Sequence, residues 1–406
     1  MNEKFEKLGF YPADILLPKG QDMTKWAVVA CDQFTSEPEY WEAVERQVGD
    51  APSTLRLILP EANLKAPNVD ELIGEINASM EKYLAGGVFE TLTDSLLYIE
   101  RQQSDGTIRH GLIGMVDLDD YDFTPGSGAL IRATEATVTE RIPPRMQIRE
   151  GAALELPHVL LLCDDPEDLL IGLLGRQKAA FPKLYGFELM QGGGQVRGWL
   201  LEGVVLRRLR ERLDAYCAGR KLCYAVGDGN HSLATAKACW EQIKKEHAGE
   251  DLSGHPARYA SVELENLHGP GQRWEAIHRL VTGCDAEKLF SAAAAALDDG
   301  AGAELRCVTG SGERVLHLSG SLPVARLQAF LDAYLSENAG SLDYIHGEDA
   351  LRALAAREGS LGFLLPAMDK GVLFPAIEAG ELLPRKTFSM GSAREKRYYL
   401  EARIIQ

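Results

Sequence analysis

The sequence lacks the patterns of several common functional sites. It has no C-x-x-C pair, no zinc-like Cys/His spacing, no G-x-S-x-G turn and no G-x-x-x-x-G-K-[ST] loop. No apolar run approaches the roughly 18 residues that a membrane-spanning helix needs. The first twenty residues also lack the apolar centre of a secretory signal peptide. We therefore expect a cytoplasmic protein with none of these chemistries.

Positive charge is also scarce. The chain has 43 Lys and Arg residues against 60 Asp and Glu residues, a formal net charge of −17. This balance argues against a broad nucleic-acid surface and against docking on an anionic membrane. It still allows a small, locally basic pocket for a phosphorylated metabolite. The seven cysteines are an odd number in mostly apolar surroundings, which predicts free, mostly buried thiols in a reducing compartment.

Predicted strands and helices alternate along the 406 residues, which indicates a mixed α/β or α+β fold. We expect a catalytic region over 1–284 with its core at about 130–280, a small α+β unit over 285–380, and a basic strip over 381–406 that folds back onto the catalytic region. The expected helices are 37–48, 232–247, 286–297, 324–336 and 348–358. Strands are expected at 26–31, 54–59, 95–102, 158–163 and 222–226, at 257–264 with one polar face exposed, and as a hairpin over 187–201.

The strongest local pattern runs from Tyr224 to Lys237. A strand ends, Gly227 and Gly229 allow a tight turn, and a helix begins near His231 and Ser232. Backbone N–H groups and the positive end of the helix dipole meet at such a point and favour an anion. Gly229, Asn230 and Ser232 would then contact phosphate.

Two side chains of this turn could take part in chemistry. Asp228 could hold Mg²⁺ or accept a proton, and His231 could donate a hydrogen bond to phosphate or act as a general acid/base. A simpler interpretation is that Asp or Asn caps the helix. A dinucleotide site is a weaker alternative, because Gly227-x-Gly229-x-x-Ser232 only approximates G-x-G-x-x-G/A.

Further candidates lie outside this turn. Arg132 could bind a phosphate, and Glu135 could act as a general base towards a hydroxyl. The alternative for this segment is an exposed strand, although Arg141, Arg145 and Arg149 make it locally basic. Lys386 could supply a point charge to a phosphoryl group or be an ordinary surface lysine.

Three more residues are candidates for substrate binding. Asp32 follows the first buried strand and could recognise a substrate amine or a metal, or it could be a turn residue. His278 and Arg279 follow a strand and a turn, and His278 could equally be a buried, satisfied core histidine. Gly192–Gly194 favours a plain hairpin turn over a mobile lid.

The chain resembles a known family at several places. Segments 26–41, 132–135, 228–236, 276–279 and 383–386 are similar to the prokaryotic family called domain of unknown function 1015, over nearly the whole length. The segment Asp228-Gly-Asn-His-Ser-Leu-Ala-Thr-Ala also resembles the D-G-H-H-R-x-x-A box of the ParB/sulfiredoxin-like superfamily, which includes free serine kinases. The resemblance implies a ParB/sulfiredoxin-like core and phosphate binding at the box. Asn230 and Ser232 depart from it, and the missing arginine removes a bidentate phosphate clamp.

Our first hypothesis is therefore a phosphotransferase that acts on the hydroxyl of a small metabolite. Free L-serine, giving O-phosphoserine, is the expected acceptor; ADP, ATP or pyrophosphate would be the donor, with Mg²⁺ at Asp228. Asp228, His231 and Glu135 should then converge in one pocket. The alternatives are a non-catalytic nucleotide- or phosphometabolite-binding switch of the ParB type and a dinucleotide-dependent oxidoreductase. A homodimer is compatible with each of them.

Overall fold

The computed structural model describes residues 9–137, 140, 142–320, 322–381, 383–384 and 386–406. Two residues of the expected basic segments, Arg141 and Arg385, lie outside this set. The fold is mixed α and β, as the sequence predicts. None of the described helices is both long enough and apolar enough to cross a membrane.

The chain forms two compact units. The first comprises Met1–Gln272, Ile377–Gly380 and Ser392–Gln406, and the second comprises Arg273–Ala376 and Glu381–Gly391. The second unit begins before residue 285 because strand β14 belongs to its sheet. The division of the chain by function stays a prediction.

The first unit is built on a sheet of eleven described strands. Its main path runs β10 (Lys183–Glu188), β11 (Gln195–Leu201), β4 (Phe89–Gln102), β5 (Ile108–Asp117), β13 (Tyr259–Asn266), β9 (Leu160–Cys163), β12 (Tyr224–Asp228), β7 (Ile131–Ala133) and β6 (Tyr121–Asp122), with β1 (Phe10–Tyr11) beside β5 and β2 (Ala13–Pro18) beside β4. Most pairs are antiparallel, but β12 and β7 are parallel. Their C-terminal ends therefore meet at one edge of the sheet.

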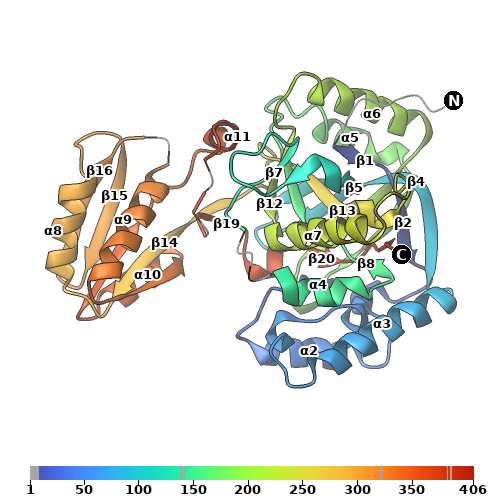
Figure 1. Cartoon of the computed structure of the whole chain (residues 1–406), viewed down its shortest axis with the longest axis horizontal. Helices are drawn as coiled ribbons and strands as arrows, with labels where there is room; N and C mark the ends of the chain where they lie inside the picture. The colour runs from blue at the N-terminus through green and yellow to red at the C-terminus, as the bar shows by residue number, and fades with distance from the viewer. Residues whose placement is uncertain (1–8, 138–139, 141, 321, 382, 385) are drawn as a thin grey trace. The chain divides into compact units, whose positions relative to one another are not determined.

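Both faces of this sheet are buried. On β4, Leu97 and Ile99 pack into one apolar cluster, and Leu96 and Tyr98 pack into another. The first face is covered by α2 (Pro38–Val48), α3 (Val69–Ala85) and the C-terminal segment, and the second by α5 (Gly172–Gln177), α6 (Gly203–Cys217) and α7 (Asn230–Glu246). The short α4 (Ile142–Glu150) lies beside α7 (Figure 1).

Several local predictions are confirmed. The helix expected over 232–247 is α7, on which Leu233, Ala236 and Trp240 are buried and Ile243 is half-buried. Segment 187–201 contains the β10–β11 turn of an antiparallel hairpin. All seven cysteines are free, and five of them are buried.

The prediction of a strand at 54–59 is wrong, because this segment begins with a 3₁₀ helix, Thr54–Leu57. Ser53 caps that helix by accepting a hydrogen bond from the Leu55 N–H, at 3.2 Å. The buried Thr54 hydroxyl donates to the Trp26 carbonyl, at 2.8 Å. In the run 26–31, residues 26–30 are buried, but α1 (Met23–Trp26) ends in this run and only β3 (Val28–Val29) is a strand.

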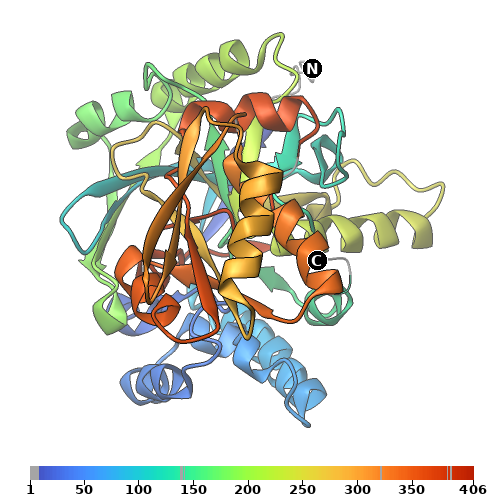
Figure 2. The ribbon, with the colours of Figure 1, turned by 90° about the vertical axis from the view of Figure 1, so that its left-hand side faces the viewer.

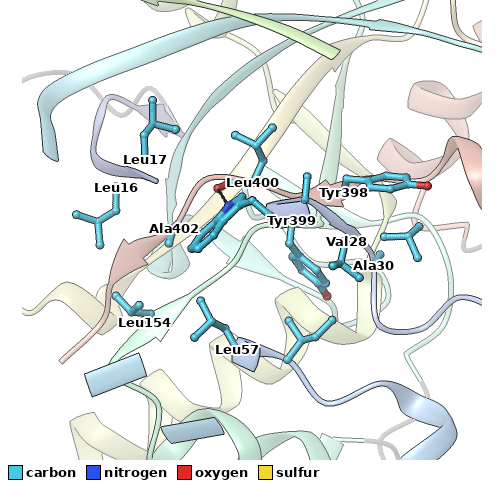
Figure 3. Close-up of a cluster of buried hydrophobic side chains, with 14 of the residues drawn as sticks. Leu16, Leu17, Val28, Ala30, Leu57, Leu154, Tyr398, Tyr399, Leu400 and Ala402 are labelled. Atoms are coloured by element: carbon cyan, nitrogen blue, oxygen red, sulfur yellow. Dashed lines mark hydrogen bonds between the residues drawn. The ribbon is translucent and has the colours of Figure 1, made fainter. Parts of the chain in front are cut away.

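The C-terminal segment forms part of the core of the first unit. Strand β20 (Tyr398–Tyr399) pairs with β3, and β21 (Arg403–Ile404) pairs with β8 (Leu154–Glu155). Figure 3 shows Leu400 and Ala402 of this segment among Leu16, Leu17 and Leu154. The buried Trp26 indole N–H donates to the Leu400 carbonyl, at 2.9 Å. The last residues of the chain therefore complete the core that the first strands begin.

The prediction that β13 exposes its polar face is wrong. Glu263 and Glu265 are only 1% and 0% exposed. Each carboxylate has a buried arginine partner: Arg397 lies 2.8 Å from Glu263, and Arg109 lies 2.7 Å from Glu265. Because β13 is a central strand covered on both sides, its acidic side chains contact buried arginines instead of forming a solvated face.

The second unit is a smaller sheet with helices on both faces. The strand order is β16 (Gly312–Leu318), β15 (Ala303–Thr309), β18 (Ser360–Leu364), β14 (Trp274–Thr282) and β17 (Ser341–His346), and β19 (Phe388–Met390) also pairs with β14. Helices α8 (Ala286–Leu297) and α9 (Pro323–Glu337) pack on one face, and α10 (Glu348–Ala355) packs on the other (Figure 2). Helix α11 (Leu373–Glu378) follows in the sequence.

Candidate functional site

The turn between β12 and α7 is tight. Gly229 has φ +80° and ψ 26°, a left-handed conformation that favours glycine. A Cβ atom at this position would lie 3.1 Å from the Cα atom of Val159. Gly229 is also the N-cap of α7, so Asp228 does not cap the helix. Instead, the Asp228 Oδ1 atom accepts a hydrogen bond from the Gly229 N–H, at 2.9 Å.

Asp228 has a cationic partner from the far end of the chain. The Lys396 ammonium lies 2.9 Å from the Asp228 Oδ2 atom, and their side chains are 13% and 29% exposed. Burial acts to raise the pKa of Asp228, but the Lys396 charge and hydrogen bond outweigh it and hold this pKa below its usual value. Lys396 was missed from the sequence, where its only signal is membership of the basic strip.

Buried arginines fix the backbone that carries Lys396. The Arg101 guanidinium donates to the carbonyl oxygens of Arg394, at 2.9 Å, and Lys396, at 3.2 Å. Arg109 donates to the Glu395 carbonyl, at 3.0 Å. Both arginines are only 4% exposed. Lys396 thus extends from a segment that the sheet strands β4 and β5 hold in place.

The parallel β7–β12 pairing brings Glu135 to the same edge of the sheet as Asp228. Ala133 is paired with Val226, and each carboxylate follows its strand partner by two residues. The Thr134 hydroxyl donates to the Val226 carbonyl, at 2.7 Å, and ties the two strand ends together. Glu135 itself is half-buried.

Asn230 offers a buried acceptor at this edge. Its amide nitrogen donates to the Thr134 hydroxyl, at 3.4 Å, while its Oδ1 atom is buried without a hydrogen-bond partner among the residues that the structure describes. The described residues contain no cluster of three or more His, Cys, Asp and Glu side chains that could hold a metal ion. However, Mg²⁺ is often held by one or two carboxylates and substrate phosphates. At this edge of the sheet, Asp228 and Asn230 carry oxygen atoms that could contribute to a site of that kind.

A second group of polar residues lies beside the first turn of α7. The Ser232 hydroxyl lies 2.7 Å from the His158 Nε2 atom, and His158 Nδ1 lies 2.8 Å from the Tyr399 hydroxyl. Tyr399 donates in turn to the Cys31 sulfur, at 3.1 Å. His158 and Tyr399 were missed from the sequence because they come from distant segments. We name these four residues the Ser232–His158–Tyr399–Cys31 chain.

Cys31 is an unfavourable nucleophile in this arrangement. Burial, reinforced by the charge of Asp32, raises the pKa of the Cys31 thiol to about 12. Asp32 accepts a hydrogen bond from the adjacent Gln33 amide, at 3.0 Å. His231 is half-buried on α7, where its carbonyl accepts from the Thr235 hydroxyl, at 2.7 Å.

Arg132 makes contacts typical of a structural arginine. It is buried on β7, and its guanidinium donates to the carbonyl oxygens of Ala129, Lys221 and Ile377, at 2.9, 2.8 and 3.4 Å. The guanidinium thus ties together backbone segments around β7. A role for Arg132 in phosphate binding stays a prediction.

The remaining three candidates lie together in the second unit. Arg279 is fully buried on β14 and donates to the Lys386 carbonyl, at 3.0 Å. The Arg279 guanidinium and the Lys386 ammonium lie 4.6 and 5.2 Å from the centre of the Tyr344 ring. His278 accepts a hydrogen bond from the Leu365 N–H, at 3.2 Å, and burial lowers its pKa. These contacts agree with a satisfied core histidine, and the substrate roles of the three residues stay predictions.

A family model described as "Protein of unknown function (DUF1015)" matches residues 12–401. The chain belongs to this family. No curated protein matches the sequence.

Several solved structures are loosely similar to the family member described here. A conserved hypothetical protein from Pyrococcus furiosus is 12% identical, with a TM-score of 0.34, over 70% of this chain and 90% of that one. Free serine kinase in complex with AMP is 12% identical, with a TM-score of 0.38, over 72% and 90%. C-terminally truncated SbnI from Staphylococcus aureus is 10% identical, with a TM-score of 0.37, over 69% and 83%.

Proposed function

We propose that this protein transfers a phosphoryl group between a phosphorylated donor and the hydroxyl of a small metabolite. The observation that carries the proposal is the Asp228–Lys396 pair at the start of α7. A lysine ammonium, the N-terminus of a 17-residue helix and a tight glycine turn lie together there. Phosphoryl transfer depends mainly on positioning and on neutralising charge, which these groups can supply.

Each residue has a role in this proposal. The turn from Gly229 to Ser232 holds the phosphoryl oxygens, and Lys396 balances their charge. Asp228 orients Lys396, and Glu135 accepts the proton of the attacking hydroxyl. Bound Mg²⁺, held by Asp228 and Asn230, would neutralise phosphate charge. The pair of Asp228 with Lys396 supports this assignment because a cation is already placed at the strand end.

The donor and acceptor are less closely defined. We expect ADP, ATP or pyrophosphate as the donor, and L-serine is the acceptor that the sequence resemblance implies. We expect the protein to act in the cytoplasm on small molecules, without nucleic acid or membrane partners. The homodimer stays a prediction.

A ligand screen followed by a transfer assay tests the proposal. Thermal unfolding of the full chain is measured with ADP, ATP, pyrophosphate, serine and phosphoserine, each with and without Mg²⁺. A true ligand at 100 times its dissociation constant should stabilise the protein by about 2.7 kcal/mol. The assay then follows phosphate transfer from each binding donor. Binding without any transfer would favour the nucleotide-binding switch, and no binding at all would overturn the proposal.

A further inference from the structure

The first unit contains a cavity of about 180 Å³ beside the start of α7. Most of its wall is apolar. Side chains from five different parts of the fold contribute: Leu57, Met80, Ile148, Leu154, Leu156 and Leu233. An engineered apolar cavity of about 150 Å³ binds benzene, so this cavity has room for a ring or a compact branched chain.

One end of the cavity is polar. Ser232, His158, Tyr399 and Cys31 all line it, and they form the hydrogen-bonded chain described above. The Tyr399 oxygen accepts from the Cys31 N–H, at 3.3 Å, while its own proton goes to the Cys31 sulfur. Tyr399 therefore presents a lone pair to His158 Nδ1, which assigns the proton to that nitrogen.

This tautomer fixes the direction of the hydrogen bond to Ser232. With a proton on Nδ1, His158 Nε2 is an acceptor and the Ser232 hydroxyl donates to it. The Ser232 oxygen keeps lone pairs that can accept a hydrogen bond from a ligand. The polar end of the cavity can thus bind a group that donates a hydrogen bond, such as an alcohol O–H.

The cavity lies beside the proposed phosphate turn. Ser232 belongs both to the first turn of α7 and to the cavity wall. A Cβ atom at Gly229 would lie 3.5 Å from His158 Cδ2, so the histidine ring rests directly against the turn. A molecule in the cavity with its hydroxyl at Ser232 would therefore lie next to a phosphoryl group held at Gly229.

The charged residues on the wall are already paired. Arg145 forms an ion pair with Glu61, and Arg149 lies 2.7 Å from Glu155. An amino acid placed in the cavity would set its ammonium and carboxylate against leucine and isoleucine side chains without free counter-charges on this wall. Burying charges without partners is costly.

We infer that the acceptor is an uncharged alcohol with a compact apolar body, which fills the cavity and places its hydroxyl at Ser232. This inference rests on the proposed phosphotransferase function, and it replaces L-serine by a different substrate class. The apolar body would contact the apolar wall of the cavity, and the hydroxyl would bind at its polar end.

Binding of four probes without any phosphoryl donor tests the inference. Benzyl alcohol, toluene, 2-naphthylmethanol and L-serine are titrated into the full chain, with binding measured by ligand-observed NMR. Ile148→Phe fills the cavity and should weaken benzyl alcohol binding at least tenfold. Ile148→Ala enlarges it and should improve binding of 2-naphthylmethanol relative to benzyl alcohol. Ser232→Ala should weaken benzyl alcohol several-fold but leave toluene binding unchanged.

Ile243 supplies the matched control. It is also a half-buried isoleucine of the first unit, but it lies on α7 away from the cavity wall. Ile243→Phe and Ile243→Ala should leave the affinities of all probes unchanged. The inference would be overturned if L-serine bound more tightly than benzyl alcohol. It would also be overturned if neither Ile148 variant changed the affinities of the alcohols.

A separate measurement distinguishes this result from failure of the phosphotransferase proposal. Donor binding and phosphate transfer are followed in wild type and Asp228→Asn. Donor binding that depends on Asp228, together with a serine-selective acceptor site, would overturn only the alcohol inference. A different result would overturn the phosphotransferase proposal: the Ile148 variants change alcohol affinity as expected, but the protein binds no phosphoryl donor. The role of the alcohol as acceptor would then fall as well.

Discussion

The carboxylate of Asp228 and the ammonium of Lys396 lie 2.9 Å apart, although one ends a central strand and the other lies near the C-terminus. Strand β12 positions the carboxylate, and buried arginines on β4 and β5 position the segment that carries the lysine. Deleting residues 382–406 would also remove core side chains, so it is a poor test of the site. Point substitutions separate charge from folding.

We predict that Asp228→Asn and Lys396→Met each lower phosphoryl transfer about 100-fold or more. Lys396→Met removes the cation that balances phosphoryl charge, and Asp228→Asn removes the carboxylate that orients this cation. Each should cost about 1–2 kcal/mol of stability, since the pair is partly buried. The double variant should be less damaging than the sum of the single changes, because both remove the same interaction. Steady-state kinetics and denaturant unfolding measure these effects.

Two other lysines serve as controls for this prediction. Lys245→Met changes an exposed lysine at the end of α7 and should alter neither quantity. Lys386→Met changes the lysine that the sequence singled out. Loss of activity with Lys386→Met and none with Lys396→Met would show that the wrong lysine has been placed at the site.

Arg101→Lys should disturb the site from a distance. The new side chain keeps a positive charge but lacks the guanidinium N–H groups that donate to the carbonyl oxygens of Arg394 and Lys396. We expect a stability loss of about 2 kcal/mol, as for a buried hydrogen-bond network left incomplete. The coupling energy between Asp228 and Lys396 should also shrink in a double-mutant cycle. Arg314→Lys, at a surface arginine paired with Glu287, should change stability by less than about 0.5 kcal/mol.

Gly229→Ala tests the tightness of the turn. Any side chain is strained at its φ of +80°, and the new Cβ atom would also press on Val159. Gly219→Ala is the matched control, because Gly219 has φ +74° but open space around it. Both changes should destabilise the protein in urea, and Gly229→Ala should cost more and weaken phosphate binding. Equal losses of stability with intact phosphate binding would contradict a close approach at the turn.

The stability of the protein should depend on the protonation of Glu265. Burial, reinforced by the negative charge of Glu263, raises the pKa of Glu265 to about 8 in spite of Arg109. Between pH 4.5 and 8 the folded protein therefore holds one more proton here than the unfolded chain, and this residue makes stability fall as pH rises.

Glu265→Gln should remove that contribution, which is at most about 1.4 kcal/mol per pH unit. Urea unfolding of wild type and variant from pH 5 to 8 measures the difference. Glu304→Gln, at an exposed position of β15, should leave the pH dependence as it is in wild type. Parallel curves for wild type and Glu265→Gln would mean that Glu265 is ionised throughout this range.

The sequence predicted the helices and turns that depend on residues close together in the chain. Helix α8 has the expected bounds, and the turn at Gly229 follows from a strand, two glycines and a helix within a few residues. Lys396 and His158 reach the same place through pairings between distant segments, which no short pattern records. The buried charges of β13 were missed for the same reason, because their arginine partners lie far away in the sequence.

Because strands β20 and β21 lie among the first strands, the order of folding during synthesis is constrained. Trp26 is made long before Leu400, so the Trp26 indole cannot meet the Leu400 carbonyl until residue 400 has been made. The second unit lies wholly before Ser392 and can assemble earlier. Multidomain chains usually fold from the N-terminus as they emerge. Here the unit that is begun first is completed last, after β21 has been made.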